Sequence, residues 1–214
     1  MTSRALAKPR LWIVAGPNGC GKSTLYGNSD ISQLDGSVWI INPDLLTAKL
    51  LEQADLPSQG ANFLPPHGAN LEAVKRIEVW LRKSIDVYQT IGVETVLSTD
   101  KYRKLVRIAK RRGFEVRLIY AFVDSVELQL ERIRLRVAKG GHDVPPDKVL
   151  ARRARSLEQL NWFFWQADAA WIYDNSSAEP QLVVKRSGLQ GFISAKTPTE
   201  IRRAIGFGSR NSSH

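Results

Sequence analysis

The sequence has 214 residues, 43% of them hydrophobic and 24% charged, and its 31 Lys and Arg outnumber its 21 Asp and Glu, for a net charge of +10. This is ordinary globular composition, and the chain is long enough for one well-buried domain and short for two. No apolar run approaches the roughly 20 residues that span a bilayer, and a single cysteine cannot form an intramolecular disulfide, so we expect one cytoplasmic domain over residues 1–214.

Apolar runs bounded by turn-forming residues predict strands, in chain order at 10–15, 38–41, within 91–97, and at 114–123, 169–174, 181–186 and 191–194. Helical periodicity predicts the helices between them, in chain order at 22 to about 28, 44 to about 54, 71 to about 89, 101–112, 126–139 and 145 to about 167. The stretch 55–70, rich in Pro, Gly and Asn, is predicted as a loop, and the tail 206–214 as disordered. The alternation predicts an α/β three-layer sandwich, with a mainly parallel sheet and helices on both faces.

A glycine-rich loop joins the first strand to the first helix. Residues 16–23, GPNGCGKS, fit G-x-x-x-x-G-K-[ST] in the strand–loop–helix context of a phosphate-binding loop. Backbone N–H groups and the helix N-terminus attract phosphate, Lys22 adds a positive charge, and the Ser23 hydroxyl can ligate Mg²⁺. Cys20 is interpreted as a small loop residue, with a thiol of lowered pKa as the alternative. ATP and Mg²⁺ are the predicted cofactors, and the predicted ATP-binding residues of the loop are Gly16, Pro17, Asn18, Gly19, Cys20, Gly21, Lys22, Ser23 and Thr24.

Transport ATPases, switch GTPases and small kinases share this loop, and the rest of the sequence separates the three classes. Transport ATPases carry an LSGGQ-like signature and an acidic pair that ends an apolar strand, and GTPases carry an N-K-x-D motif. The sequence contains none of these, because Asp124 at the end of LIYAFVD is followed by Ser125. The remaining class is a phosphotransferase for a small substrate, in which a lid closes over donor and acceptor.

Such an enzyme needs a carboxylate for the acceptor hydroxyl and cations for the transferring phosphoryl group. Asp44 follows the second strand on the ligand side of the sheet, where it could act as the base or as a helix N-cap. Glu94 and Thr95 lie near the end of the third strand, where Glu94 could face either the site or solvent. The residues alone leave these alternatives open.

Positive charge is concentrated in one stretch. Residues 101–155 contain sixteen Lys or Arg and six Asp or Glu, whereas the rest of the chain is balanced. Within that stretch, 132–156 carries arginines on two predicted helices around Gly140-Gly141, which favours a lid that brings guanidinium groups over phosphate. We expect one or two of these arginines to contact phosphate and the others to be solvated.

Five segments together resemble the zeta-toxin family of small kinases, over roughly residues 10–187. They are GPNGCGKST, INPD (41–44), VETVLS (93–98), RVAKGGHDVP (136–145) with ARRARSLEQL (151–160), and YDNS (173–176). The resemblance implies a P-loop kinase of the adenylate-kinase-like type. Well-known members phosphorylate the amino-sugar 3′-hydroxyl of UDP-N-acetylglucosamine with ATP, and plasmid-borne members are toxins held by a small antitoxin.

The resemblance also implies roles for individual residues. Lys22 and Ser23 would hold ATP and Mg²⁺, and Asp44 would be the general base. Glu94, with Thr95 or Ser98, would position the acceptor. Arg136 and Arg153 would clamp the phosphoryl group, and Asp174 and Asn175 would border the nucleotide site.

Three functions follow, in order of preference. The first is a kinase for a UDP-amino sugar, and the second is a kinase for another hydroxyl, on a nucleoside, a metabolite or an RNA 5′ end. The third is a nucleotide-binding regulatory module with little turnover, whose basic face docks an acidic partner such as an antitoxin. A nucleotide and an anionic small-molecule acceptor are therefore the expected partners. Nucleic acid is possible but not favoured, because aromatic side chains that could stack on bases are sparse in 101–155.

Overall fold

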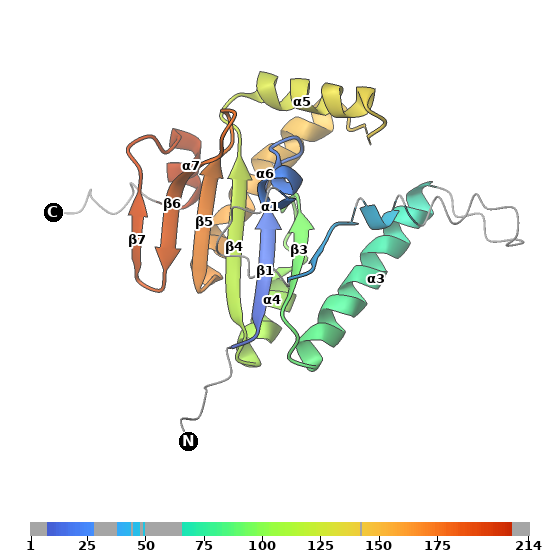
Figure 1. Ribbon diagram of the computed structural model, residues 1–214, viewed down its shortest axis with the longest axis vertical. Helices are drawn as coiled ribbons and strands as arrows, with labels where there is room; N and C mark the ends of the chain where they lie inside the picture. Colours follow the sequence, from blue (N-terminus) through green and yellow to red (C-terminus); the bar gives the residue numbers. More distant parts are fainter. Residues whose placement is uncertain are drawn as a thin grey trace, which may run out of the picture.

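The computed structural model describes residues 8–27, 38–43, 45–47, 49, 66–141 and 143–206. One seven-stranded sheet forms its centre, in the order β2-β3-β1-β4-β5-β6-β7 (Figure 1). The first five strands in this order are parallel, and β6 and β7 are antiparallel to their neighbours. The strands are β1 (Arg10–Ala15), β2 (Ile40–Ile41), β3 (Ile91–Thr95), β4 (Glu115–Phe122), β5 (Ala169–Asp174), β6 (Gln181–Ser187) and β7 (Gln190–Ile193).

Helices cover both faces of the sheet, as the sequence predicts. Their bounds are α1 (Lys22–Gly27), α3 (Pro66–Asp86), α4 (Arg103–Arg111), α5 (Val126–Ala138), α6 (Pro146–Gln166) and α7 (Thr199–Ala204). Apolar side chains of α3, α4, α6 and α7 pack with alternate strand residues such as Leu11 and Ile13 on one face. Leu25 of α1 packs with Trp12 and Trp171 on the other face. The α/β three-layer architecture with a mainly parallel sheet is confirmed.

The parallel strands place the loops that follow β1, β2, β3 and β5, where the predicted site residues lie, at one end of the sheet. In Figure 1 the carboxyl ends of β1, β3, β4 and β5 point upward, and α5 lies above them. The phosphate loop follows β1, and Glu94, the penultimate residue of β3, lies beside the end of β1, because Val14 pairs with Glu94 across the two strands. Ligands of open α/β sheets bind at this end, and the candidate site is built there.

Element boundaries differ from the sequence predictions, for example at the start of the long helix, in the second strand and after Pro198. The long helix begins at Pro66 and not at Leu71, so the predicted loop 55–70 is wrong for residues 66–70. Proline is favoured at the first position of a helix because its missing N–H is not needed there. The second strand covers only Ile40–Ile41 of the predicted 38–41. The short helix α7, which begins after Pro198, was not predicted.

Several sequence predictions fall on residues whose structure is not described. Asp44, most of the helix predicted at 44–54, His142 and the tail from 207 onward lie outside the described residues. Residues 45–47 and 49 of that helix are helical. Within the described ranges, no helix is both long and apolar enough to cross a bilayer.

Candidate functional site

The phosphate loop wraps around the ammonium group of Lys22. This side chain is buried, and its Nζ donates hydrogen bonds to the carbonyl oxygens of Gly16 at 2.9 Å and Pro17 at 3.1 Å. Gly21 has a φ of +82°, and a Cβ at this position would lie 2.1 Å from Nδ2 of Asn175. Only glycine fits such a backbone conformation and such a close approach. The loop is therefore shaped by its own residues and by the end of β5.

Glu94 lies at the centre of the site. Its carboxylate oxygen Oε2 accepts hydrogen bonds from the Ser23 hydroxyl at 3.1 Å and from Asn42 Nδ2 at 2.9 Å. The other oxygen, Oε1, lies 3.9 Å from Lys22 Nζ, and the residue is 8% exposed. Asn42 also caps the helix after β2, because its Oδ1 accepts from the Leu45 N–H at 3.3 Å. The carboxylate thus joins the phosphate loop to the end of β2.

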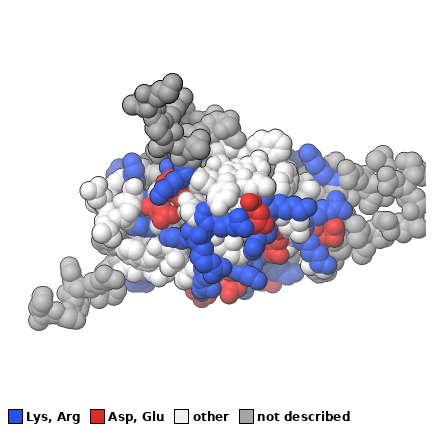
Figure 2. Space-filling view, turned by 90° about the horizontal axis from the view of Figure 1, so that it is seen from below, with Lys and Arg blue, Asp and Glu red and all other residues white. Residues whose placement is uncertain are grey.

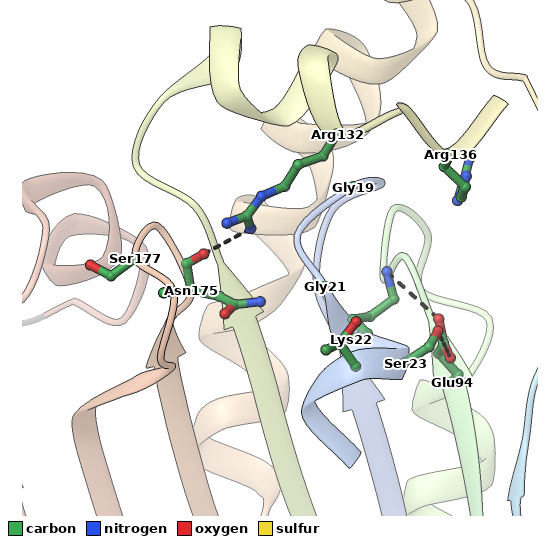
Figure 3. A pocket seen from close by; sticks show the side chains of 11 residues that line it. Gly19, Gly21, Lys22, Ser23, Glu94, Arg132, Arg136, Asn175 and Ser177 are labelled. Carbon is green, nitrogen blue, oxygen red and sulfur yellow. Dashed lines mark hydrogen bonds and ion pairs between the residues drawn. The ribbon is translucent and has the colours of Figure 1, made fainter. Parts of the chain in front are cut away.

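A first cavity, of about 430 Å³, opens on the side of the loop that faces β5 (Figure 3). Asn175 is buried there, and its Nδ2 donates to the Cys20 carbonyl of the loop at 2.8 Å. Arg132 of α5 reaches across the cavity and donates to the Asn175 carbonyl at 2.7 Å. The lining residues are Gly19, Gly21, Lys22, Ser23, Thr24, Glu94, Arg132, Arg136, Asn175, Ser177 and Ala178.

A second cavity, of about 320 Å³, adjoins the first on the side of β2 and β3. The turn after β3 is strained, since Leu97 is buried with a φ of +59° and its N–H bonds to Thr95 Oγ1 at 3.0 Å. Strain of this kind is retained where the surrounding structure holds it, often at functional sites. The lining side chains that the sequence predicted are Asn18, Lys22, Glu94, Thr95, Ser98 and Arg136, and Asn42, Lys101 and Arg152 join them.

The phosphate loop, Glu94 and the arginine-bearing helices fall inside one recognised family. A family model described as an AAA domain matches residues 11–160. The chain belongs to this family. The match ends within α6, so Asn175 and the loop after β5 lie beyond the part that defines the AAA domain.

A relative of this AAA-domain chain is an uncharacterized protein of Haemophilus influenzae. It is 28% identical over 155 residues, which make up 69% of this chain and 99% of the relative.

Two solved structures have a fold similar to that of this AAA-domain chain. A complex of AvrRxo1-ORF1 with AvrRxo1-ORF2 and sulphate ions matches with a TM-score of 0.69 at 17% identity, and covers 97% of this chain and 66% of the matched chain. The PezAT chromosomal toxin–antitoxin system of Streptococcus pneumoniae matches with a TM-score of 0.62 at 18% identity, over 94% of this chain and 78% of that one. At these identities the likeness concerns the fold, and it confirms the predicted P-loop kinase fold.

Arg136 and Arg153, the two predicted phosphoryl clamps, occupy different environments in the AAA-domain chain. Arg136 lines both cavities. Arg153 is 4% exposed and lies below the site, where its guanidinium donates to the carbonyls of Val123 and Asp124 and to the Glu200 carboxylate. Its neighbour Arg152 lines the second cavity. A one-residue step on a helix turns the side chain by about 100°, which is enough to separate the two.

The thiol alternative for Cys20 is not supported. The side chain is fully buried, and burial raises the pKa of the thiol above its ordinary value, although Lys22 acts in the opposite direction. A nucleophilic cysteine needs a lowered pKa and access to solvent. Cys20 therefore serves the loop as a small buried side chain.

The sequence reasoning gave no role to Asn42, Lys101 or Gln129. Asn42 lies in the INPD segment and Lys101 in the basic stretch, and Arg152 is identified only as one of several lid arginines. Gln129, which is 0% exposed, donates from Nε2 to the Asn18 carbonyl of the phosphate loop at 2.7 Å. The only available signal for Gln129 was a polar residue on the inward face of a predicted helix.

Proposed function

We propose that the protein is an ATP-dependent kinase that transfers the γ-phosphate to a hydroxyl of an anionic small molecule. The observation that carries this proposal is the contact between the two cavities. Gly19, Lys22, Glu94 and Arg136 line both of them. A donor in the first cavity and an acceptor in the second would therefore meet beside two cations, Lys22 and Arg136, and the Glu94 carboxylate. Phosphoryl transfer requires such an arrangement.

The first cavity suits a nucleoside triphosphate. The phosphate chain would lie on the loop N–H groups and on the N-terminus of α1, with Lys22 moving from the loop carbonyls to the β- and γ-phosphates. Asn175 and the loop after β5 would border the nucleoside. Two hard oxygen groups, the Ser23 hydroxyl and the Glu94 carboxylate 3.1 Å from it, fit Mg²⁺, which prefers oxygen ligands. When bound there, Mg²⁺ would neutralise charge on the phosphates.

The second cavity suits an acceptor that carries negative charge. Lys101, Arg136 and Arg152 line it together with the hydroxyls of Thr95 and Ser98. Burial lowers the pKa of Lys101, an effect that Glu78 opposes. In the transfer step a carboxylate base takes the proton of the acceptor hydroxyl, the acceptor oxygen bonds to the γ-phosphorus, and the bond to the β–γ bridging oxygen breaks to release ADP.

Asp44 is our candidate for that base. It follows Asn42 and Pro43, both of which line the acceptor cavity. The cap of the helix after β2 is supplied by Asn42, so a capping role does not account for an aspartate at position 44. This assignment rests on the chain neighbours of Asp44 and on the resemblance to zeta toxins.

The acceptor that we would test first is UDP-N-acetylglucosamine. Its diphosphate matches the positive lining of the second cavity, and the resemblance to zeta toxins names this substrate class. The fold likeness to the PezAT toxin–antitoxin system, and to AvrRxo1-ORF1:ORF2, of which one structure contains ATP, supports ATP as the donor and an antitoxin as a partner. A small antitoxin protein is accordingly a partner to search for.

The experiment is a product assay by mass spectrometry. Purified protein with Mg·ATP and UDP-N-acetylglucosamine should give a product heavier by one phosphate, and Asp44→Asn should abolish it while ATP affinity stays within about threefold. Glu94→Gln should also abolish transfer, and it should weaken the Mg²⁺ dependence of ATP binding, because the neutral amide holds the metal site less well.

The outcomes separate the alternatives. Product from a different hydroxyl acceptor alone would retain the kinase and remove the UDP-amino sugar. ATP binding without phosphorylated product from any acceptor would favour a regulatory module.

A further inference from the structure

Lys and Arg side chains gather at the end of the molecule opposite the phosphate loop. The helices α3 and α4 end there, beside the amino ends of β1 and β4 (Figure 1). Seen from below, Lys and Arg cover much of this end, with Asp and Glu lying among them at several places (Figure 2). We call it the basal surface, and its cations are Arg10, Arg82, Lys83, Lys110, Arg111, Arg112 and Arg117.

Internal ion pairs account for only part of this charge. Three carboxylates lie among the seven cations, and each of them is bound by cations of the same surface. The pairs are Asp86 with Arg82 at 3.5 Å and Arg112 at 3.1 Å, Glu115 with Arg10 at 3.6 Å and Arg117 at 2.9 Å, and Asp168 with Lys110 at 3.3 Å. An excess of four positive charges remains, and it lies far from the phosphate loop, so it does not serve ATP.

Tyr88 adds an exposed aromatic ring to the same surface. It is 59% exposed, its ring stacks on Phe114 at 6.2 Å between centroids, and the Arg112 guanidinium lies 5.9 Å from it. Tyr88 has a φ of +57° at the end of α3, where its N–H bonds to Ile85 O and the next N–H bonds to Ser84 O. This is the helix-terminating motif in which glycine is strongly preferred, so a tyrosine is held there at a cost in stability.

We propose that the basal surface binds single-stranded nucleic acid. Phosphates would lie on the exposed cations Lys83 and Arg111 and their neighbours, and one base would stack on Tyr88 beside the Arg112 guanidinium. Cationic grooves with aromatic rings are the common means of binding single strands. An acidic protein would need the cations alone, and it would give no reason for an exposed tyrosine in a conformation that glycine adopts more easily.

Sequence reasoning disfavoured nucleic acid because aromatic side chains are sparse in 101–155. The fold supplies one from outside that stretch, since Tyr88 at the end of α3 contacts Phe114 and Arg112 at the end of α4. The proposal does not depend on the kinase assignment.

The test is fluorescence anisotropy with a fluorescein-labelled 12-nucleotide oligouridine. Affinity should fall with salt, with a slope of about −0.7 for each phosphate that is contacted. Lys83→Ala with Arg111→Ala should reduce the magnitude of that slope by about 1.4. The matched control is Arg134→Ala with Lys148→Ala, which removes two exposed cations from the opposite end and should leave binding unchanged.

Tyr88→Gly separates recognition from folding. Glycine suits a φ of +57°, so the melting temperature should stay the same or rise, whereas loss of the stacking ring should weaken oligouridine binding about fivefold or more. ATP affinity should not change. Unchanged oligouridine affinity in Tyr88→Gly, or competition by polyglutamate as effective as by unlabelled oligouridine, would overturn the proposal, and the latter would indicate an acidic protein partner.

Discussion

At the scale of single residues, Gln129 controls the direction of one peptide group in the phosphate loop. Its Nε2 donates to the Asn18 carbonyl at 2.7 Å, and its Oε1 accepts from the Arg153 guanidinium at 3.1 Å. Because the C=O and N–H of a trans peptide point in opposite directions, a carbonyl fixed toward Gln129 turns the Gly19 N–H toward the first cavity. We therefore expect Gln129 to position this peptide group for a bound phosphate, and the Arg153 guanidinium holds Gln129 in turn.

Gln129→Met should weaken ATP binding about tenfold. Methionine keeps the volume but removes the donor, which leaves a buried carbonyl without its partner and lets the peptide turn its oxygen toward the phosphates. Titration calorimetry with ATP and with adenosine checks this, because adenosine has no phosphate and should bind the variant as it binds the parent. Gln159→Met is the control, since Gln159 Oε1 accepts from Arg103, on α4. An equal loss for both ligands would refute the positioning role.

Residue roles could be predicted where they lie in one contiguous segment and not where distant segments meet. The phosphate loop could be identified because strand, glycines, Lys22 and Ser23 are adjacent in the chain. The hydrogen bonds of Glu94 join residues 71 and 52 positions away, so spacing alone could not show that it holds the loop serine.

At the scale of elements, α5 carries the cations above the site and fixes them to the phosphate loop. Ser125 caps the helix by accepting from the Leu128 N–H at 3.2 Å. Ile133 packs with Val144 and Val149 around the start of α6. A Cβ on Gly19 would lie 2.7 Å from the Gln129 carbonyl and 2.9 Å from Ile133, so the loop and α5 are in close contact. This packing holds the arginines of α5 close to the phosphate loop.

Arg136→Ala should lower kcat about 100-fold and change ATP affinity by less than about threefold. A guanidinium that meets charge developing on the transferring phosphoryl group stabilises the transition state more than the bound nucleotide. Steady-state kinetics with the acceptor identified by mass spectrometry, together with ATP titration, separate the two quantities. Arg134→Ala removes an exposed cation from the same helix and should leave both unchanged. A rise in KM for ATP at constant kcat would assign Arg136 to binding alone.

Elements with a strong hydrophobic pattern and clear turn signals at their ends were predicted well, and elements without them were not. The strands at 10–15 and 169–174 have the predicted bounds, because each is an apolar run ended by a turn or loop. The six-residue helix α7 buries only Ile201, so it has no periodicity to detect. Its position depends on contacts that the sequence does not display, such as the Trp165 indole that donates to the Ile205 carbonyl just beyond it.

At the scale of the whole molecule, the fold divides the positive stretch between two ends. The helix α4 runs toward the basal surface, so the cations at its end lie there. Arg132, Arg136 and Arg152 lie at the carboxyl end of the sheet. The sequence located the charge and placed a lid within 132–156, but it did not show that the cations at the end of α4 and those of the lid lie at opposite ends of the sheet. A parallel sheet separates them because each helix returns the chain from one end of the sheet to the other.

The core also contains two buried tyrosines, whose ionisation makes the folded state less stable at alkaline pH. Burial raises the pKa of Tyr102 and of Tyr120 well above the ordinary value, and Tyr120 shares a hydrogen bond of 2.9 Å with Ser156. In the unfolded chain both would titrate near pH 10. A folded-state pKa above the unfolded one means that the stabilisation is fully present below about pH 10 and is lost as pH rises further.

We therefore expect the free energy of unfolding to decline gently above about pH 8.5, where the Cys20 thiol of the unfolded chain ionises, and to fall more steeply beyond pH 10, where the tyrosines join it. Urea denaturation at half-unit steps from pH 8 to pH 11 measures this dependence. Tyr102→Phe with Tyr120→Phe removes both hydroxyls and should make the alkaline decline shallower, even though the loss of the Ser156 hydrogen bond lowers stability at every pH. Tyr88→Phe changes an exposed ring and should leave the slope as it is. A buried tyrosine hydroxyl loses its proton only after the core has opened, so the two tyrosines should steepen the decline in the parent. Equal slopes above pH 10 in the parent and the double variant would mean that other groups, lysines foremost, cause the decline.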